Sequence, residues 1–171
     1  MGTSSVLLIR FAQPQDLPRM VDIYNQAILA QNATGDMHPF SVEERKDWFS
    51  KFSQDEFPVY VAEQQGSVVG YCYLSPYRPG RQAMARVAEI SYYVDYDLHR
   101  QGIGEALMEF TIAEARRLQK EVLLAILLDI NLPSIRLLEK FNFQRWGHLP
   151  EIIQLEKQRC GHVIYGLDLK R

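Results

Sequence analysis

The residues best suited to chemistry lie in a turn with the sequence HRQGIG, residues 99–104. An apolar run typical of a strand precedes it at 87–95, and an amphipathic helical pattern follows from Ala106 to Leu118. The first N–H groups of a helix have no partner within it, and the helix dipole adds positive charge there. Because glycines lack a Cβ atom, a phosphate can approach these N–H groups closely. The turn therefore predicts a phosphate-binding site, and glycines that serve only tight packing are the alternative.

Better-known phosphate loops and other reactive motifs do not fit this sequence. A Rossmann turn needs G-x-G-x-x-G, but Leu107 stands where the third glycine belongs, and no Walker string occurs. The histidines show no metal-ligand spacing, and no G-x-S-x-G elbow of a serine hydrolase is found. Cys72, inside an apolar run, is interpreted as a packed thiol. No metal is expected.

The elements that must position the turn can be read from periodicity and turn residues. Strands are expected at 6–12, 57–63, 68–75, 87–95, 122–128, 143–147 and 163–169, and helices at 14–28, 41–52, 102–120 and 131–141. Ser41 and Glu44 form a capping box, and Gln65-Gly66 is typical of a hairpin turn. A helix crosses between the fourth and fifth strands, which predicts that they are parallel. The order indicates one α/β domain with a mixed sheet over residues 1–171, its core at about 6–169.

Composition excludes several classes of protein. A chain of 171 residues with 47% apolar and 23% charged side chains is ordinary for a globular domain. Its net charge of -2 argues against nucleic-acid binding through bulk positive charge. No apolar run approaches the ~20 residues of a membrane span. Residues 1–6 match neither a signal peptide nor a myristoylation site, and Cys72 and Cys160 are expected to be reduced thiols. The expected location is the cytoplasm.

The glycine turn resembles the signature Q/R-x-x-G-x-G/A of the GNAT superfamily of N-acetyltransferases. The chain is similar in particular to the phosphinothricin acetyltransferase group, over nearly its whole length and without a gap from Arg81 through Glu105. The matching positions are Ile23, Tyr24, Asn25, Trp48, Arg81, Ala83, Glu89, Tyr93, Val94, Asn131, Ser134, Ile135, Arg136, Leu137 and Phe143. This resemblance implies the GNAT acyl-CoA N-acyltransferase fold, α/β or α+β. Its mixed sheet is mostly antiparallel, and its parallel fourth and fifth strands splay apart.

The resemblance also implies acetyl-CoA as co-substrate and a set of contacts to it. These are Tyr92, Tyr93 and Val94 for pantetheine, Arg100, Gln101, Gly102, Ile103, Gly104 and Glu105 for pyrophosphate, and Asn131 for the thiol end. A backbone N–H near Val94 is expected to polarise the thioester carbonyl. Glu89 is the candidate general base, provided that partial burial raises its pKa above about 4.3. Arg81 and Arg78 are candidate substrate ligands, and solvated loop arginines are the alternative.

Several positions depart from the family pattern. His99 occupies the first position of the signature, and Asn142 stands where a glycine usually ends the short helix. Met84 replaces a tyrosine on the substrate side. Leu138 stands where the group has a histidine that is expected to protonate the departing thiolate, which leucine cannot do. Coenzyme A thiols resemble Cys, with a pKa near ~8.5, so transfer without a dedicated acid side chain is expected.

The sequence therefore predicts an N-acetyltransferase that moves an acetyl group from acetyl-CoA to the primary amine of a small molecule. An amino acid or an analogue, phosphinothricin- or methionine-sulfoximine-like, is the expected acceptor. The alternatives are a non-catalytic acyl-CoA-binding or sensing domain and a protein or peptide N-acetyltransferase. No nucleic-acid or membrane partner is expected. Phe143, Trp146 and Leu149 place apolar side chains near the C-terminus, and related enzymes often pair there, so a homodimer is expected by analogy.

Overall fold

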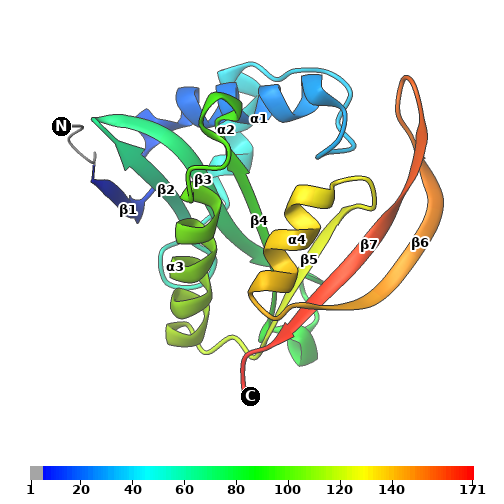
Figure 1. Ribbon diagram of the computed structural model, residues 1–171. Coiled ribbons are helices and arrows are strands. Elements are labelled where there is room, and N and C mark those ends of the chain that lie inside the picture. The colour runs from blue at the N-terminus through cyan, green and yellow to red at the C-terminus, as the bar shows by residue number, and fades with distance from the viewer. Residues whose placement is uncertain (1–5) are drawn as a thin grey trace.

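The computed structural model describes residues 6–171, which build one seven-stranded sheet with helices on both faces (Figure 1). The strands are β1 (Leu7–Phe11), β2 (Val59–Gln64), β3 (Ser67–Pro76), β4 (Val87–Val94), β5 (Val122–Leu128), β6 (Gln144–Gln154) and β7 (Arg159–Asp168). The helices are α1 (Leu17–Ala30), α2 (Val42–Ser50), α3 (Ile103–Arg117) and α4 (Leu132–Lys140), with short 3-10 turns η1 (Pro14–Asp16), η2 (Gln82–Met84) and η3 (Tyr96–Leu98). The expectations of no signal peptide and no myristoylation concern residues that lie almost entirely outside the described part.

The strand order β1-β2-β3-β4-β5-β7-β6 confirms the predicted mixed sheet, because only β4 and β5 pair in parallel. Alternate residues of β4 face opposite sides of this sheet. Ile90, Tyr92 and Val94 pack with α3 and α4 in one hydrophobic cluster, whereas Tyr93 packs with α1 and α2 in another. None of the helices within residues 6–171 has the length and apolar content needed to cross a bilayer.

The parallel strands β4 and β5 separate after a short paired stretch, as the family resemblance implies. They pair only at Val87–Val122, Ala88–Leu123 and Glu89–Leu124. Beyond this point β4 stays paired with β3 as far as Val94, while β5 stays paired with β7 as far as Leu128. Each strand keeps its other neighbour, so the two diverge as a wedge, and the backbone of β4 on the β5 side has no neighbouring strand (Figure 1).

Local signals predicted most element boundaries. The Ser41 hydroxyl accepts from the Glu44 amide, and the Glu44 carboxylate accepts from the Ser41 amide, which confirms the capping box. Gln65 and Gly66 both have positive φ, as a two-residue hairpin turn requires. Asn142 is left-handed at the end of α4, where a glycine is usual. The prediction for α3 was three residues too long, since it ends at Arg117.

Strand β6 was predicted wrongly, because it continues to Gln154 rather than ending at residue 147. Pro150 signals a break in a sequence pattern, since proline cannot donate to a strand ladder. The structure accommodates Pro150 because β6 is the last strand of the sheet and its pairing with β7 is irregular between Leu149 and Ile153. Glu151 has a positive φ of 52° in this bulge.

Both cysteines are buried and unpaired, as expected. Burial raises the pKa of the Cys72 thiol to about 12, and its side chain is fully enclosed. A thiol that stays protonated and has no access to a substrate is not a nucleophile. The interpretation of Cys72 as a packing residue therefore agrees with its environment.

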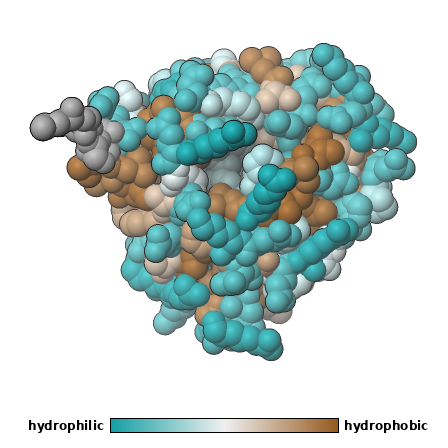
Figure 2. Space-filling model, viewed as in Figure 1, coloured by the Kyte–Doolittle hydropathy of each residue, from teal (hydrophilic) through white to brown (hydrophobic). Residues whose placement is uncertain are grey.

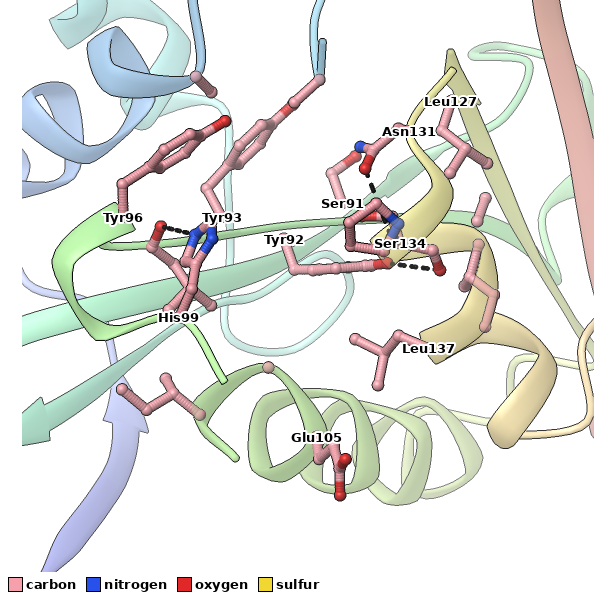
Figure 3. Close-up of a pocket in the computed structure, with 18 of the residues that line it drawn as sticks. Ser91, Tyr92, Tyr93, Tyr96, His99, Glu105, Leu127, Asn131, Ser134 and Leu137 are labelled. Carbon is pink, nitrogen blue, oxygen red and sulfur yellow. Dashed lines mark hydrogen bonds between the residues drawn. The ribbon is translucent and has the colours of Figure 1, made fainter. Parts of the chain in front are cut away.

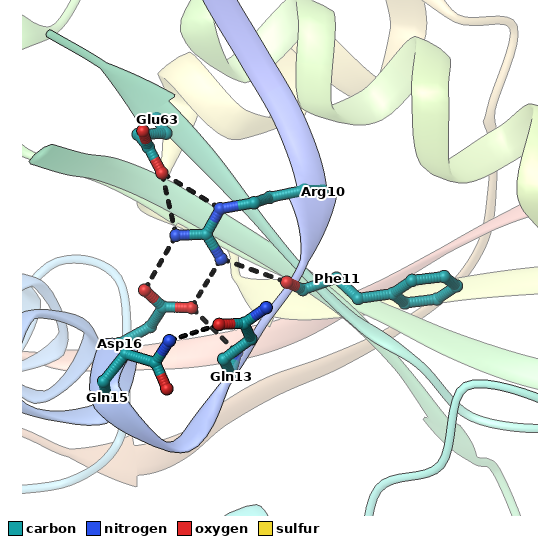
Figure 4. A network of polar contacts seen from close by, with 6 residues as sticks. All are labelled: Arg10, Phe11, Gln13, Gln15, Asp16 and Glu63. Carbon is teal, nitrogen blue, oxygen red and sulfur yellow. Dashed lines mark hydrogen bonds and ion pairs between the residues drawn. The ribbon is translucent and has the colours of Figure 1, made fainter. Parts of the chain in front are cut away.

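The start of α1 is fixed to the sheet by Arg10 of β1 (Figure 4). Its guanidinium donates to both carboxylate oxygens of Asp16, at 2.7 and 2.9 Å, and to Glu63 of β2 at 2.8 Å. Asp16 is only 6% exposed and also accepts from the Gln13 amide at 2.7 Å. Burial by itself would raise the pKa of Asp16, but the hydrogen bonds from Arg10 and Gln13 outweigh it and hold that pKa below 3.8.

We expect Asp16→Asn to lower the free energy of unfolding at neutral pH by ~3 kcal/mol, because it leaves Arg10 without its buried partner. The folded-state pKa of Asp16 is depressed, so its contribution is complete above about 3.8 and is lost as pH falls through the folded value. Urea unfolding at pH 7 and at decreasing acid pH measures both effects. The difference in the free energy of unfolding between wild type and variant should become smaller in acid. A difference that stays constant would show that it does not come from the ionised Asp16 carboxylate.

Candidate functional site

The wedge between β4 and β5 holds a cleft of about 630 Å³ (Figure 3). It opens on the face of the molecule that carries α3 and α4, which Figure 2 shows hollowed near its centre. Residues 90–94 of β4 form one wall, and residues 125–127 of β5 with the first turns of α4 form the other. The start of α3 closes one end, and Asn32 and Ala33 after α1 lie at the opening.

The wall formed by β4 offers backbone hydrogen-bonding groups to the cleft. The Asp95 amide donates to the Val69 carbonyl of β3 at 2.9 Å. Because hydrogen bonding alternates along an antiparallel pair, Tyr93 and Ser91 also face β3, and the N–H and C=O groups of Tyr92 and Val94 point toward the cleft. The Val94 carbonyl bonds His99 Nε2 at 3.0 Å. The Tyr92 and Val94 amides are therefore placed to pair with an extended ligand, in the way that a strand would. The backbone of Tyr93, which was predicted to contact pantetheine with them, pairs with β3 instead.

The start of α3 provides the anion-binding end of the cleft. Gly102, the N-cap, has a φ of +81° and no side-chain cap, and the first bond of the helix runs from the Ala106 amide to the Gly102 carbonyl. The amides of residues 103–105 therefore have no partner within the helix. A Cβ atom built on Gly102 would meet nothing within 4 Å, so its surroundings are open. These features fit a diphosphate, such as that of coenzyme A.

The structure brings most of the predicted cofactor contacts together. Of this set, Tyr92, Tyr93, Val94, Arg100, Gly102, Ile103, Gly104, Glu105 and Asn131 line the cleft, and Gln101 lies in the same turn without lining it. The Asn131 side chain caps α4 by accepting from the Ser134 amide at 3.4 Å. The Tyr92 side chain crosses toward α4, where its hydroxyl donates to the Ser134 carbonyl at 3.4 Å (Figure 3). Leu138 is fully buried and carries no ionisable group at this wall.

Glu89 lies at the closed end of the wedge, where β4 and β5 make their last pair. Strand alternation puts its side chain on the α1 and α2 face, together with Ser91 and Tyr93. The carboxyl group is half-buried and burial raises its pKa. A raised pKa makes the carboxylate a better proton acceptor, but Glu89 itself does not line the cleft.

The loop arginines predicted as substrate ligands lie elsewhere. Arg78 and Arg81 are exposed between β3 and β4, outside the lining of the cleft. The Arg78 guanidinium lies over the Tyr77 ring at 5.5 Å, and Arg81 is the residue before η2. The structure does not bring either side chain to the cleft, so their role stays a prediction.

A different arginine, Arg45 of α2, lies on the same face of the sheet as Glu89. Its guanidinium is 4.0 Å from the Trp48 ring centroid and 5.1 Å from each of the Tyr24 and Phe40 centroids. Within residues 6–171 no carboxylate pairs with it. Aromatic faces attract a cation without neutralising it, so Arg45 is a half-buried positive charge available to an anion. Sequence reasoning missed it because a charged residue on α2 is indistinguishable from a solvated one.

Aromatic side chains connect this guanidinium with the cleft and with Glu89. Tyr93, which lines the cleft, packs edge-on against Tyr24 with centroids 4.9 Å apart. Tyr73 contacts Trp48 at 5.2 Å and pairs across the sheet with Ser91, which lies next to Glu89 on the same face of β4. Burial is the main cause of its raised pKa, while the Arg45 charge lowers that pKa and the Glu89 charge raises it. A carboxylate and an unpaired guanidinium therefore lie near the same tyrosine.

Comparison with known proteins adds a further set of observations. The model of the acetyltransferase (GNAT) family matches residues 18–143. YwnH of Bacillus subtilis, provisionally named a phosphinothricin acetyltransferase, is 33% identical over 95% of this chain and 99% of its own. The L-amino acid N-acyltransferase MnaT of Escherichia coli is 30% identical over 84% of this chain and 83% of its own. A phosphinothricin acetyltransferase structure from Sinorhizobium meliloti in complex with AcCoA has a TM-score of 0.88 at 25% identity, covering 97% and 89% of the two chains.

Two glycine variants separate the binding role of the turn from its backbone strain. Gly102 (φ +81°) and Gly66 (φ +77°) are both left-handed, with nothing within 4 Å of an added Cβ. Replacing either by Ala should destabilise the fold by ~1 kcal/mol. Only Gly102→Ala should also weaken coenzyme A binding, because only its Cβ lies beside the α3 amides. Calorimetric titration with coenzyme A measures this, and equal affinity in the two variants would contradict a diphosphate site at the turn.

Proposed function

We propose, on the premise that the chain belongs to the GNAT family of acetyltransferases, that its acceptor is the primary amine of an amino acid or a close analogue. Membership of this family makes the protein an N-acetyltransferase with acetyl-CoA as co-substrate. The observation that carries the proposal is the placement of Glu89 and the unpaired Arg45 on one face of the sheet, on either side of Tyr73 and Trp48. An amino acid offers its amine to Glu89 and its carboxylate to Arg45.

Acetyl-CoA supplies an acetyl thioester, and the residues that would hold it are those of the cleft. The amides of Ile103, Gly104 and Glu105 would bind its diphosphate, with the positive end of the α3 dipole. The backbone of Tyr92 and Val94 would bind the pantetheine amides, and the Asn131 side chain would face the thiol end. Nonpolar side chains of β5 and α4 exclude water from the opposite wall.

Glu89 is proposed as the general base. The amino group of an amino acid is an ammonium ion at neutral pH, and it must lose a proton before its nitrogen can attack a carbonyl carbon. A carboxylate with an ordinary pKa is a weak acceptor for that proton. Burial raises the pKa of Glu89, which makes this carboxylate a better acceptor. Its position at the closed end of the wedge lets it take the proton directly or through water.

Arg45 is proposed to bind the carboxylate of the acceptor. Its guanidinium is held on three aromatic rings, which fixes its position at small entropic cost and leaves its N–H groups free for a planar anion. The same rings would contact the apolar part of an amino-acid side chain. The names of the related proteins, which refer to phosphinothricin and to L-amino acids, support this class of acceptor.

The remaining predictions belong to the same proposal. A homodimer is supported by apolar side chains exposed on the edge strand β6, where Trp146, Leu149 and Ile152 are 51%, 46% and 57% exposed. Phe143, which the sequence placed with this group, is buried in the core and is not part of the exposed patch. A single domain over residues 1–171 and a cytoplasmic location remain predictions. A peptide acceptor is the second candidate, and the assay with a peptide substrate distinguishes it from a free amino acid.

The activity is tested by thiol release from acetyl-CoA with a panel of free amino acids, phosphinothricin, methionine sulfoximine, an alkylamine and a peptide. We expect the amino acids and their analogues to be the best substrates. Glu89→Gln should lower kcat/KM by ~10²-fold, because a positioned base typically contributes this much or more. Wild-type activity should rise with pH through the raised pKa of Glu89, and the variant should lack this limb. An unchanged pH profile removes Glu89 from the mechanism, and preference for the peptide favours the second candidate.

The acceptor site is tested by Arg45→Gln with amino acids and their methyl esters. Losing a charge-assisted hydrogen bond of about 1.5–3 kcal/mol should raise KM for free amino acids by about 10–100-fold. The esters carry no carboxylate, so their kcat/KM should change little. Lys46→Gln is the matched control, since Lys46 on the same helix is exposed and paired with Glu43. Equal losses for acids and esters would show that Arg45 only supports the fold.

A further inference from the structure

We infer that the hydroxyl of Tyr92 protonates the sulfur of the departing coenzyme A, an inference that rests on the proposed function. Acetyl transfer forms a C–N bond and breaks a C–S bond, and the electron pair of the broken bond stays on sulfur. A thiol of ordinary acidity, with a pKa near ~8.5, holds its proton at neutral pH, so the sulfur takes up a proton in the course of the reaction. The sequence predicted that no dedicated side chain supplies this proton, because Leu138 has no acidic proton and a thiolate of this acidity can leave with help from water.

The alternation of β4 separates the two proton transfers in space. The Glu89 side chain faces α1 and α2, whereas the Tyr92 side chain belongs to the cluster packed around α3 and α4. The exposed edge of β4 runs between these two faces, from the α3 turn at Val94 to the closed end at Glu89. An amine that loses its proton to Glu89 arrives from one face. The leaving sulfur then departs toward the other face, where Tyr92 lies.

Other proton-bearing side chains at the cleft are engaged elsewhere. Tyr93 is on the Glu89 face and packs against Tyr24. The Tyr96 hydroxyl donates to Asn32 at the opening, at 3.2 Å, and His99 holds the Val94 carbonyl. The aliphatic hydroxyls of Ser91 and Ser134 are much weaker acids than a phenol. Within residues 6–171, Tyr92 is the phenol that projects from β4 to the first turn of α4 (Figure 3).

The position of the Tyr92 hydroxyl suits this role. Burial raises its pKa, so it meets the substrate as an O–H donor, and its proton must be replaced from solvent as it passes to sulfur. Its one hydrogen bond, to the Ser134 carbonyl, is long at 3.4 Å and can be exchanged for a better acceptor. When the C–S bond breaks, the Oη–H proton passes to sulfur while a proton from solvent replaces it on Oη, which gives the free thiol and leaves the phenol neutral. A free tyrosinate is not formed, because with its raised pKa it would take the proton back from a thiol of pKa near ~8.5. The two protons lost by the ammonium leave through Glu89 and solvent.

The test compares Tyr92→Phe with Tyr60→Phe. Tyr60 is also a buried tyrosine, but its hydroxyl donates to Glu114 at 2.9 Å, outside the lining of the cleft. Tyr92→Phe should lower kcat by ~10²-fold, a typical contribution of a positioned acid. It should also raise the pKa of the thiol of bound coenzyme A, followed by the ultraviolet absorbance of the thiolate, since the hydroxyl that stabilises the thiolate is gone. Tyr60→Phe should change neither quantity.

The outcomes separate this inference from the proposed function. A kcat within twofold of wild type overturns it. A lower kcat with an unchanged pKa of the bound thiol also overturns it, because Tyr92 would then act only by packing. If wild type acetylates none of the amines, the proposed acceptor fails. The thiol measurement needs no acceptor, so it still decides whether Tyr92 reaches the sulfur.

Discussion

The structure depends on how far β4 pairs with each of its two neighbouring strands. Pairing with β3 extends along the whole strand, whereas pairing with β5 ends at Glu89 because β5 follows β7 instead. A central strand normally pairs with a neighbouring strand on both sides, and residues 90–94 do so on only one. This unpaired edge creates the cleft and also supplies the hydrogen-bonding groups that line it. An extended ligand can complete the sheet there without any rearrangement of the core.

The position of α3 relative to this edge is set by close packing. A Cβ atom on Gly70 of β3 would lie 3.1 Å from the Tyr93 carbonyl and 3.2 Å from Leu107 of α3, so a larger residue would push the helix away. With Gly70 in place, α3 lies directly against the sheet and its first turn comes beside the end of β4. A Cβ atom on Gly104 would lie 3.4 Å from Leu137 and 3.8 Å from Val94, so the first turn of α3 is also packed close to α4 and β4. The proposed diphosphate site and the exposed strand edge thus form one continuous surface.

Electrostatics divides the sheet into two functional faces. The face toward α1 and α2 holds a carboxylate destabilised by burial and the Arg45 guanidinium held by aromatic rings. The other face holds the positive end of the α3 dipole and the protonated Tyr92 hydroxyl. The period of two along β4 is enough to produce this division, because neighbouring residues of one strand point in opposite directions. In the proposed mechanism, attack of the amine and departure of the leaving group therefore take place on opposite sides of one strand.

The sequence by itself determined what depends on local patterns. The glycine turn, the capping box, the hairpin at Gln65-Gly66 and the parallel pair around α3 all follow from neighbouring residues and from chain connectivity. Only the tertiary structure decided which distant side chains meet. Arg45 belongs to a helix that is remote in sequence from Glu89. The Tyr92 hydroxyl bonds to α4, a contact that no local pattern predicts. Strand β6 continues past Pro150 because it lies at the edge of the sheet. Local patterns fix φ, ψ and periodicity over a few residues, whereas burial, pKa shifts and contacts across the sheet arise only when the segments pack together.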